Sequence, residues 1–242
     1  MRIDAKTDIG NVRSSNQDSY AAGEFRNGVA WAVVCDGMGG TAGGNVASST
    51  AVKSISERIT TAYRNNMTSS SMKNLLITAI TNANYEIYDM AQAKPELRGM
   101  GTTVVSVIMT EGTVYVAHAG DSRAYIISED SIRQITRDHS IVRRMVEKGE
   151  ITEEEAQSHP NKNLITRALG VDEKLRVDFT VEEINPNDIL LVCTDGLTNS
   201  LDDSEILRLV REDSEGDFAT SLVNLANEHG GRDNITVVAI TG

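Results

Sequence analysis

The chain has 242 residues, of which 23 are Lys or Arg and 35 are Asp or Glu, so its formal net charge is −12. This length is enough for one substantial core, and composition shows no break that would divide it, so we expect one domain over residues 1–242. The acidic balance and the scattered Lys and Arg residues disfavour nucleic acid and anionic membrane surfaces as partners.

The amino terminus and the cysteines indicate the compartment. Residues 1–8 have no apolar signal-peptide core, and no apolar run approaches the ~18 residues that cross a bilayer. We therefore expect a cytoplasmic protein. Cys35 and Cys193 lie within strand-like apolar runs, which favours a role as small core residues over a redox or metal role, and no disulfide is expected.

The first clear element is the apolar run at residues 29–35, which predicts a buried strand. It leads directly into Asp36-Gly37-Met38-Gly39-Gly40, so a carboxylate and a flexible turn lie where the strand reaches the surface.

Two helices are predicted next, without a strand between them. Apolar residues at helical spacing predict a helix over residues 45–67 with Asn45 as its N-cap. The same spacing returns after a cap candidate at Ser71 and stops at Lys94-Pro95, which predicts a second helix between these points.

A group of strands follows the second helix. Residues 102–109, 113–119 and 123–128 have strand composition, and the gaps that join them are too short for a crossover helix. We therefore predict that these strands run antiparallel. The second of them leads into Gly120-Asp121, which repeats the strand-to-acid arrangement seen at Asp36.

Residues 138–170 do not fit the sheet pattern and predict a surface excursion. They contain short amphipathic turns, a break at Gly149, and a capping box formed by Thr152 and Glu155. Three arginines give the segment local positive charge: Arg143, Arg144 and Arg167. Two interpretations stay open, a solvated helical insertion and a flap that contacts substrate.

The carboxyl-terminal part predicts further strands and helices. Residues 175–181, 189–194 and 235–240 have strand patterns, and the second of these leads into Asp195-Gly196. Residues 204–210 and 218–228 carry apolar residues at helical spacing. Paired helices that alternate with antiparallel strands indicate a layered α+β fold and argue against a doubly wound parallel sheet.

Five acids at strand ends or adjoining turns suggest a metal site: Asp18, Asp36, Asp121, Asp195 and Asp233. Any one Asp-Gly alone is typical of a turn, but clustered carboxylates repel one another unless cations hold them. The four histidines include no pair at i,i+4 spacing, so oxygen ligands favour Mg²⁺ or Mn²⁺ over zinc. We expect two cations, which at ~4 Å apart can share a bridging water and stabilise an in-line displacement at phosphorus.

A phosphate ester also needs a positive group on its non-bridging oxygens. Arg13, five residues before Asp18, is the best candidate for such a bidentate contact. For Arg13 alone a surface ion pair is the simpler interpretation, and its proximity to the acids favours the phosphate contact.

Six short blocks occur in a recognisable order: residues 13–18, 36–40, 100–103, 120–123, 194–196 and 231–234. Together they resemble the motifs of bacterial type 2C metal-dependent protein serine/threonine phosphatases, over nearly the whole chain. The resemblance implies a four-layer αββα sandwich, in which two antiparallel sheets lie between paired helices. It also implies that residues 1–242 are a single catalytic domain, with a flap insertion at about residues 138–170.

The resemblance implies site residues by motif position. Asp36 corresponds to the ligand that bridges both core metals and Gly37 to a backbone-carbonyl ligand. The remaining metal ligands that it implies are Asp195 and Asp233, Asp18 acting largely through water, and Asp121 with Asp195 at a third-metal site. Arg13 corresponds to the phosphate-binding arginine, so the implied catalytic residues are Arg13 and Asp36. In this family a metal-bridging water attacks directly, without a phosphoenzyme.

One departure from the family pattern leaves the general acid open. Many bacterial members have His after the Asp-Gly-Met-Gly-Gly motif, whereas Thr41 follows Gly40 here. A metal-bound water, His118, His139 or His159 could protonate the leaving group, and a lone His is more often structural.

These observations predict an Mn²⁺- or Mg²⁺-dependent hydrolase of phosphoserine and phosphothreonine in proteins. We expect a monomer whose partners are phosphorylated proteins, including a bacterial serine/threonine kinase that it opposes and the substrates of that kinase. Two alternatives remain: a phosphatase of small phosphate esters or of a partner-switching phosphoprotein, and a catalytically inactive metal-binding regulatory module. The complete acid set and Arg13 argue against the inactive module.

Overall fold

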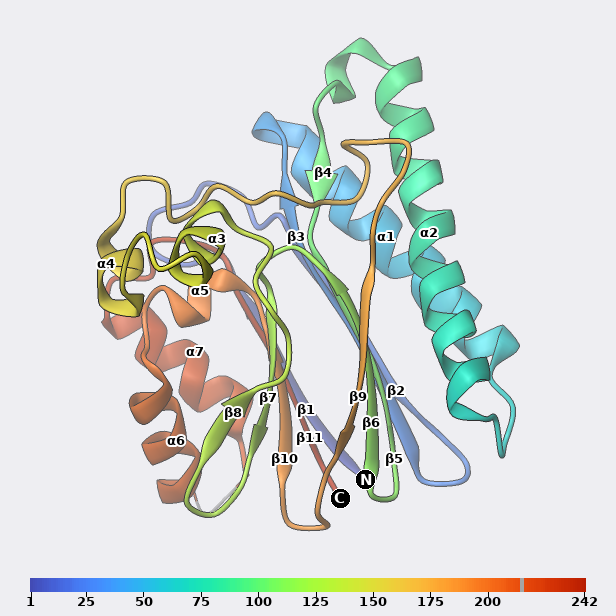
Figure 1. Cartoon of the computed structure of the whole chain (residues 1–242), viewed down its shortest axis with the longest axis vertical. Helices are drawn as coiled ribbons and strands as arrows, with labels where there is room; N and C mark the ends of the chain where they lie inside the picture. The colour runs from blue at the N-terminus through green and yellow to red at the C-terminus, as the bar shows by residue number, and fades with distance from the viewer. Residues whose placement is uncertain (214–215) are drawn as a thin grey trace.

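The computed structural model describes residues 1–213 and 216–242, and within these ranges two antiparallel sheets lie face to face between layers of helices (Figure 1). The side chains of Thr41 and Ala42 also lie outside the description. The strands are β1 (Arg2–Asp8), β2 (Asp18–Phe25), β3 (Val29–Met38), β4 (Gly101–Thr102), β5 (Val104–Thr110), β6 (Thr113–Ala119), β7 (Arg123–Ile127), β8 (Ile132–Gln134), β9 (Asp178–Glu183), β10 (Ile189–Cys193) and β11 (Ile235–Thr241). The helices are α1 (Gly40–Ala62), α2 (Ser69–Ala93), the 3-10 turn η1 (Pro95–Leu97), α3 (Ile141–Glu147), α4 (Glu153–Ser158), α5 (Asp195–Thr198), α6 (Asp203–Glu212) and α7 (Phe218–Glu228).

The two sheets draw strands from distant parts of the chain. One has the order β1-β11-β10-β7-β8, and the other has the order β2-β3-β5-β6-β9 with β4 paired to β3. Helices α1 and α2 lie over the outer face of the second sheet, while α6 and α7 lie over the outer face of the first (Figure 1). The predicted α+β sandwich with antiparallel sheets between paired helices is confirmed.

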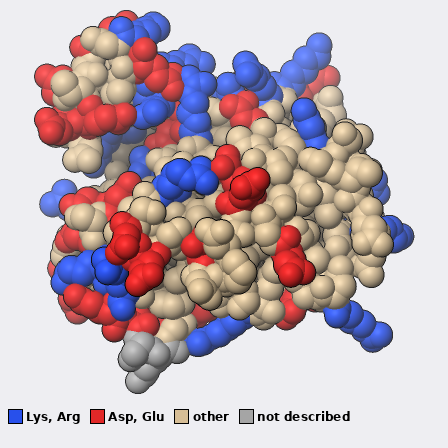
Figure 2. Space-filling view, turned by 60° about the horizontal axis from the view of Figure 1, so that its bottom comes forward, with Lys and Arg blue, Asp and Glu red and all other residues tan. Residues whose placement is uncertain are grey.

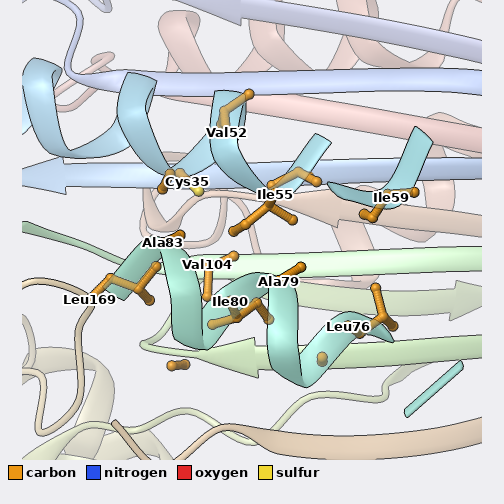
Figure 3. Close-up of a cluster of buried hydrophobic side chains, with 14 of the residues drawn as sticks. Cys35, Val52, Ile55, Ile59, Leu76, Ala79, Ile80, Ala83, Val104 and Leu169 are labelled. Atoms are coloured by element: carbon orange, nitrogen blue, oxygen red, sulfur yellow. The ribbon is translucent and has the colours of Figure 1, made fainter. Parts of the chain in front are cut away.

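Three buried clusters, counted over the described residues, hold these layers together. Strand β3 shows how one strand serves two of them, because successive side chains point to opposite faces. Val33 and Cys35 pack against α1 and α2, whereas Ala32 and Val34 pack into the core between the sheets. Figure 3 shows the helix-facing cluster, where Cys35 lies among side chains of both helices. A strand buried on both faces explains the continuous apolar run at residues 29–35.

The amino-terminal strand pairs with the carboxyl-terminal strand. In the register of β1 with β11, Arg2 lies opposite Thr241 and Asp8 opposite Ile235. This pairing brings the segment after β1, which carries Arg13, beside the turn that precedes β11. Strands β1 and β2 were not predicted from the sequence, because their residues are mostly half-buried and follow no clear apolar alternation.

Both long helices begin earlier than expected. The first was predicted over residues 45–67, but α1 spans Gly40–Ala62 and its N-cap is Gly39, with φ 123°. Its first turn carries no large apolar residue, so the periodicity does not mark the start. The second begins at Ser69 instead of after Ser71, because Thr68 is the N-cap and accepts a hydrogen bond from the Ser71 amide. Its predicted end at Lys94 is confirmed.

The strands after α2 are only partly as predicted. β5 and β6 pair antiparallel, but β6 and β7 belong to different sheets and do not pair. Gly120 makes this crossing possible: its φ is +115°, and a Cβ at this position would lie 2.6 Å from the Cβ of Thr103. The chain therefore changes sheet at Gly120-Asp121-Ser122, and Asp121 lies at that crossing.

The predicted excursion at residues 138–170 contains α3 and α4, and α4 begins with the predicted capping box of Thr152 and Glu155. Its two ends meet in a short antiparallel stem. The Thr166 amide donates to the His139 carbonyl at 2.7 Å, and the Ile141 amide donates to the Leu164 carbonyl at 2.9 Å. We call residues 138–170 the flap.

The remaining predicted elements lie close to their expected places. β9 begins at Asp178, three residues after the predicted strand start at residue 175, and α7 has the predicted bounds. Among the described residues, no helix is long and apolar enough to cross a membrane. On the face drawn in Figure 2, basic and acidic side chains are interspersed and lie most densely on the left of the view, which matches the scattered charge of the sequence.

Candidate active site

A pocket of about 450 Å³ opens where strands of both sheets end. Four of the five predicted acids line it, together with Arg13, Gly37 and two flap residues. The described residues around it are Arg13, Ser14, Ser15, Gln17, Asp36, Gly37, Met38, Gly39, Gly40, Thr103, Asp121, Asn163, Ile165, Asp195, Asp233 and Asn234. The fold therefore brings together residues that are more than 200 positions apart in the chain.

Asp36 lies near the end of β3, and its backbone is held on both sides. Its amide donates to Thr103 Oγ1 at 2.9 Å, while its carbonyl accepts from the Thr103 amide at 2.9 Å and from Thr102 Oγ1 at 2.8 Å. The side chain is left free of these contacts and lines the pocket. The backbone clamp thus fixes the carboxylate at the pocket wall.

Gly37 follows in very close contact with the start of α1. A Cβ added at Gly37 would lie 2.1 Å from the Gly44 carbonyl oxygen and 2.6 Å from the Gln17 carbonyl oxygen. The Gly37 amide donates to that same Gln17 carbonyl at 3.1 Å. Only glycine fits at this position, because backbone approaches it from two directions.

Asp18 lies opposite Asp36 on the neighbouring strand β2 but is buried and does not line the pocket. Its Oδ2 accepts hydrogen bonds from Thr194 Oγ1 at 2.8 Å and from Thr236 Oγ1 at 2.7 Å. Its Oδ1 is buried and has no hydrogen-bond partner among the described residues. This role of the two threonines was not predicted from the sequence; they lie directly before Asp195 and within β11.

Asp195 begins the short helix α5 directly after β10. Its Oδ2 accepts from Asn199 Nδ2 at 2.9 Å, and its Oδ1 is buried without a partner in the part of the chain that the structure describes. A carboxylate in the first turn of a helix faces the unpaired backbone amides there, although a helix of this length contributes little dipole. Asp195 thus presents one unpaired oxygen to the acid cluster.

Asp233 and Arg13 form an ion pair at the pocket rim, with Arg13 Nη2 2.7 Å from Asp233 Oδ2. The segment that carries Arg13 is held by Asn234, a role that the sequence analysis missed. Asn234 Oδ1 accepts from the Gln17 amide at 2.8 Å, and its Nδ2 donates to the carbonyls of Ile9 at 2.9 Å and Ser15 at 3.0 Å. The sequence signal available for this role was that Asn234 directly follows the candidate ligand Asp233.

The acids destabilise one another's charged forms. Burial raises the pKa of Asp36 well above its usual range, and repulsion by Asp195 adds to the effect. Burial also raises the pKa of Asp121 to about 8 and that of Asp18 to about 7, with Asp195 as a further cause in both cases. For Asp195 itself, burial and then Asp233 raise the pKa. Carboxylates held together at such a cost are typical of a cation site.

A second group of possible metal ligands lies beside the pocket: His118, His139 and Asp178, whose ligand atoms are all within 4.8 Å of one another. The two rings stack at 4.8 Å with an interplanar angle of 5°, so their nitrogens do not converge on one point. Arg167 already pairs with Asp178, at 2.8 Å. Burial lowers the pKa of His139 to about 4, so this ring is neutral at neutral pH.

The positions of the three histidines considered as general acid support none of them in that role. His118, His139 and His159 are not among the described residues that line the pocket. The prediction about Thr41 concerns a side chain that lies outside the described residues.

Comparisons with known proteins find similar chains over nearly the whole length of this one. The profile of the protein phosphatase 2C family matches residues 11–235. The serine/threonine phosphatase Stp of Listeria innocua is 38% identical over 99% of this chain and 95% of its own length. Among solved structures, Stp1 of Staphylococcus aureus has a TM-score of 0.92 and 37% identity, covering 99% of this chain and 95% of that one. The catalytic domain of PstP in complex with two manganese ions has a TM-score of 0.85 and 33% identity, covering 98% of this chain and 96% of that one.

Proposed function

The chain belongs to the protein phosphatase 2C family and is a metal-dependent serine/threonine phosphatase, and we propose that the acidic pocket at Asp36 is where it hydrolyses phosphoserine and phosphothreonine. The observation that carries the proposal is the pair of buried, unpartnered carboxylate oxygens, Asp18 Oδ1 and Asp195 Oδ1, in a cluster of mutually repelling acids.

The donor set fits Mn²⁺ or Mg²⁺, because these cations take oxygen ligands and neutralise the repulsion. Asp36, the Gly37 carbonyl, Asp195 and Asp233 would hold two core ions, with Asp18 behind them and Asp121 with Asp195 at a third. When bound, such ions lower the pKa of water and stabilise charge on the phosphoryl oxygens. The tight packing of Gly37 against Gly44 and Gln17 supports a role for its backbone.

Arg13 would bind the phosphate of the substrate. Its side chain lies at the rim, 55% exposed, and one nitrogen of its guanidinium pairs with Asp233. The remaining N–H groups have the planar geometry that suits two phosphate oxygens at once. Asp233 orients Arg13 toward the pocket and raises the pKa of the guanidinium, which keeps it charged.

We extend the proposal to organisation and partners. Residues 1–242 would act as one catalytic domain, in which the flap contributes Asn163 and Ile165 to the pocket wall. Its partners would be a serine/threonine kinase and the substrates of that kinase, and the protein would act as a monomer in the cytoplasm. The two buried, unpaired thiols, Cys35 and Cys193, suit a reducing compartment.

Hydrolysis of a phosphothreonine peptide tests the proposal. We expect turnover with Mn²⁺, loss of turnover when a chelator is added, and recovery when Mn²⁺ is returned in excess. Undiminished turnover in chelator would contradict a metal-dependent pocket. Incubation with kinase-phosphorylated lysate, read by phosphoproteomics, would then identify the substrates.

A further inference from the structure

We infer that His139 is a positioning residue for Asp121: its ring, oriented by Asp178, fixes Gly120 and through it the carboxylate at the pocket wall. The inference rests on the proposed function of the pocket and adds residues that do not line it. It starts from the turn at which the chain changes sheet, where Asp121 follows Gly120 with its positive φ.

His139 bonds to Gly120 twice. The His139 amide donates to the Gly120 carbonyl at 2.9 Å, and the Gly120 amide donates to the His139 ring nitrogen Nδ1 at 3.1 Å. The N–H of the peptide unit before Gly120 and the C=O of the unit after it are thus both held by a single residue, which is 4% exposed. Gly120 is also pressed against Thr103, so the turn has little freedom to move.

The second bond requires one tautomer of the imidazole. Because Nδ1 accepts from the Gly120 amide, the proton of the neutral ring must lie on Nε2. Nε2 is 3.1 Å from Asp178 Oδ2, which accepts that proton and so selects the tautomer. With the proton on Nδ1 instead, two N–H groups would face each other at Gly120.

Asp178 is held in turn by the far end of the flap. Arg167 Nη1 donates to Asp178 Oδ1 at 2.8 Å. The same Nη1 lies 2.9 Å from His139 Nε2, because both nitrogens donate to the one carboxylate of Asp178. His139 begins the flap and Arg167 lies near its end, and the stem joins them through the bond from Thr166 to His139. The root of the flap, strand β9 and the Asp121 turn therefore form one hydrogen-bonded unit.

His139 therefore links the flap to the pocket through the backbone of Gly120, and not through a residue that would itself bind a metal ion. Asp121 lines the pocket, and its position follows that of Gly120. Loss of the Nδ1 contact would leave the Gly120 amide buried without an acceptor and loosen the turn. The affinity for the ion that Asp121 would hold should fall, while the other acids keep their places.

Two isosteric substitutions separate this role from packing. In His139→Asn the amide oxygen can take the place of Nδ1 and accept from Gly120, but the contact with Asp178 is lost. In His139→Gln the longer amide can take the place of Nε2 and reach Asp178, but nothing accepts from Gly120. His159→Gln is the matched control, because His159 Nδ1 accepts from the Asn161 amide at 3.0 Å in an exposed loop of the flap.

The readout is the affinity for Mn²⁺, measured by electron paramagnetic resonance of free Mn²⁺, with Asp121→Asn as the benchmark. We expect His139→Gln to weaken the most weakly bound ion about tenfold, as Asp121→Asn does, and to regain kcat at high Mn²⁺. His139→Asn should keep the affinity within about threefold, and His159→Gln should not change it. The double variant His139→Gln/Asp121→Asn should lose no more than Asp121→Asn alone.

Equal Mn²⁺ affinity in His139→Gln and His139→Asn, or additive losses in the double variant, would overturn the inference. Should thermal unfolding show that His139→Gln does not fold, Asp178→Asn serves instead. Arg167 and His139 approach different oxygens of Asp178, so in Asp178→Asn the carbonyl oxygen facing Arg167 leaves the amide N–H₂ facing His139 Nε2. Nε2 must then accept, the ring proton moves to Nδ1, and Gly120 loses its acceptor, so the same loss of Mn²⁺ affinity is expected and its absence counts against the inference. Wild-type protein that binds no Mn²⁺ would instead contradict the proposed function itself.

Discussion

Substitution of Gly37 by Ala tests how the end of β3 and the start of α1 are packed around the pocket. The added Cβ would lie 2.1 Å from one carbonyl oxygen and 2.6 Å from another, well inside normal contact distance, and both obstacles are backbone. Overpacking that must move backbone typically costs about 1–3 kcal/mol, and we expect the upper end here. At about 2–4 °C per kcal/mol for a chain of this size, Tm should fall by about 6–12 °C.

Thermal unfolding followed by circular dichroism in chelator measures this change without any contribution from bound metal. Gly43→Ala is the matched control, because its nearest contact is the Met100 side chain at 3.0 Å and alanine is the better helix former inside α1. The control should unfold within about 3 °C of wild type. A Gly37→Ala protein with unchanged Tm and full activity would refute the argument that backbone contact holds the pocket wall.

Three further outcomes follow from the site. Asp121 and Asp18 have pKa values of about 8 and about 7 in the folded protein, against about 4 when unfolded, so the folded state holds protons that the unfolded state releases. In urea titrations with chelator, the free energy of unfolding of the metal-free protein should therefore fall as pH rises from about 4 to about 8. A free energy of unfolding that rises with pH over this window would contradict the mutual repulsion of the acids. In steady-state kinetics, Arg13→Ala should raise KM for a phosphopeptide about tenfold with little loss of kcat or stability. The KM of Arg13→Lys should lie between those of wild type and Arg13→Ala, and a change in kcat alone would place Arg13 elsewhere in the mechanism. Asn234→Ala removes three hydrogen bonds between backbone segments and should cost about 2–4 kcal/mol in urea unfolding, whereas a loss below about 0.5 kcal/mol would show that the segment is held by other contacts.

The sequence predicts which acids line the pocket better than it predicts the strand order of the sheets. Asp36 and Asp195 follow continuous apolar strands, so their place at strand ends can be predicted from local pattern alone. The crossing at Gly120 could not be predicted, because a short gap after a strand looks the same whether the next strand pairs with it or joins another sheet. Only the packing of Gly120 against Thr103 distinguishes the two.

The supporting contacts were missed for a related reason. Thr194 and Thr236 hold Asp18 across two strands, and Asn234 joins segments more than 200 positions apart. Polar residues of this kind carry no periodicity, and their partners are set by strand order, which the sequence pattern left open. The same holds for His139, whose function depends on Gly120 and Asp178 together.

The turnover of a phosphothreonine peptide by Asp36→Asn in Mn²⁺ tests most directly whether the pocket at Asp36 is the site of hydrolysis. Asp89→Asn, on the exposed surface of α2, is the matched control for the loss of one carboxylate charge. We predict that Asp89→Asn keeps wild-type turnover, while Asp36→Asn loses several orders of magnitude in kcat/KM and remains folded. An Asp36→Asn protein with wild-type turnover would contradict the central claim.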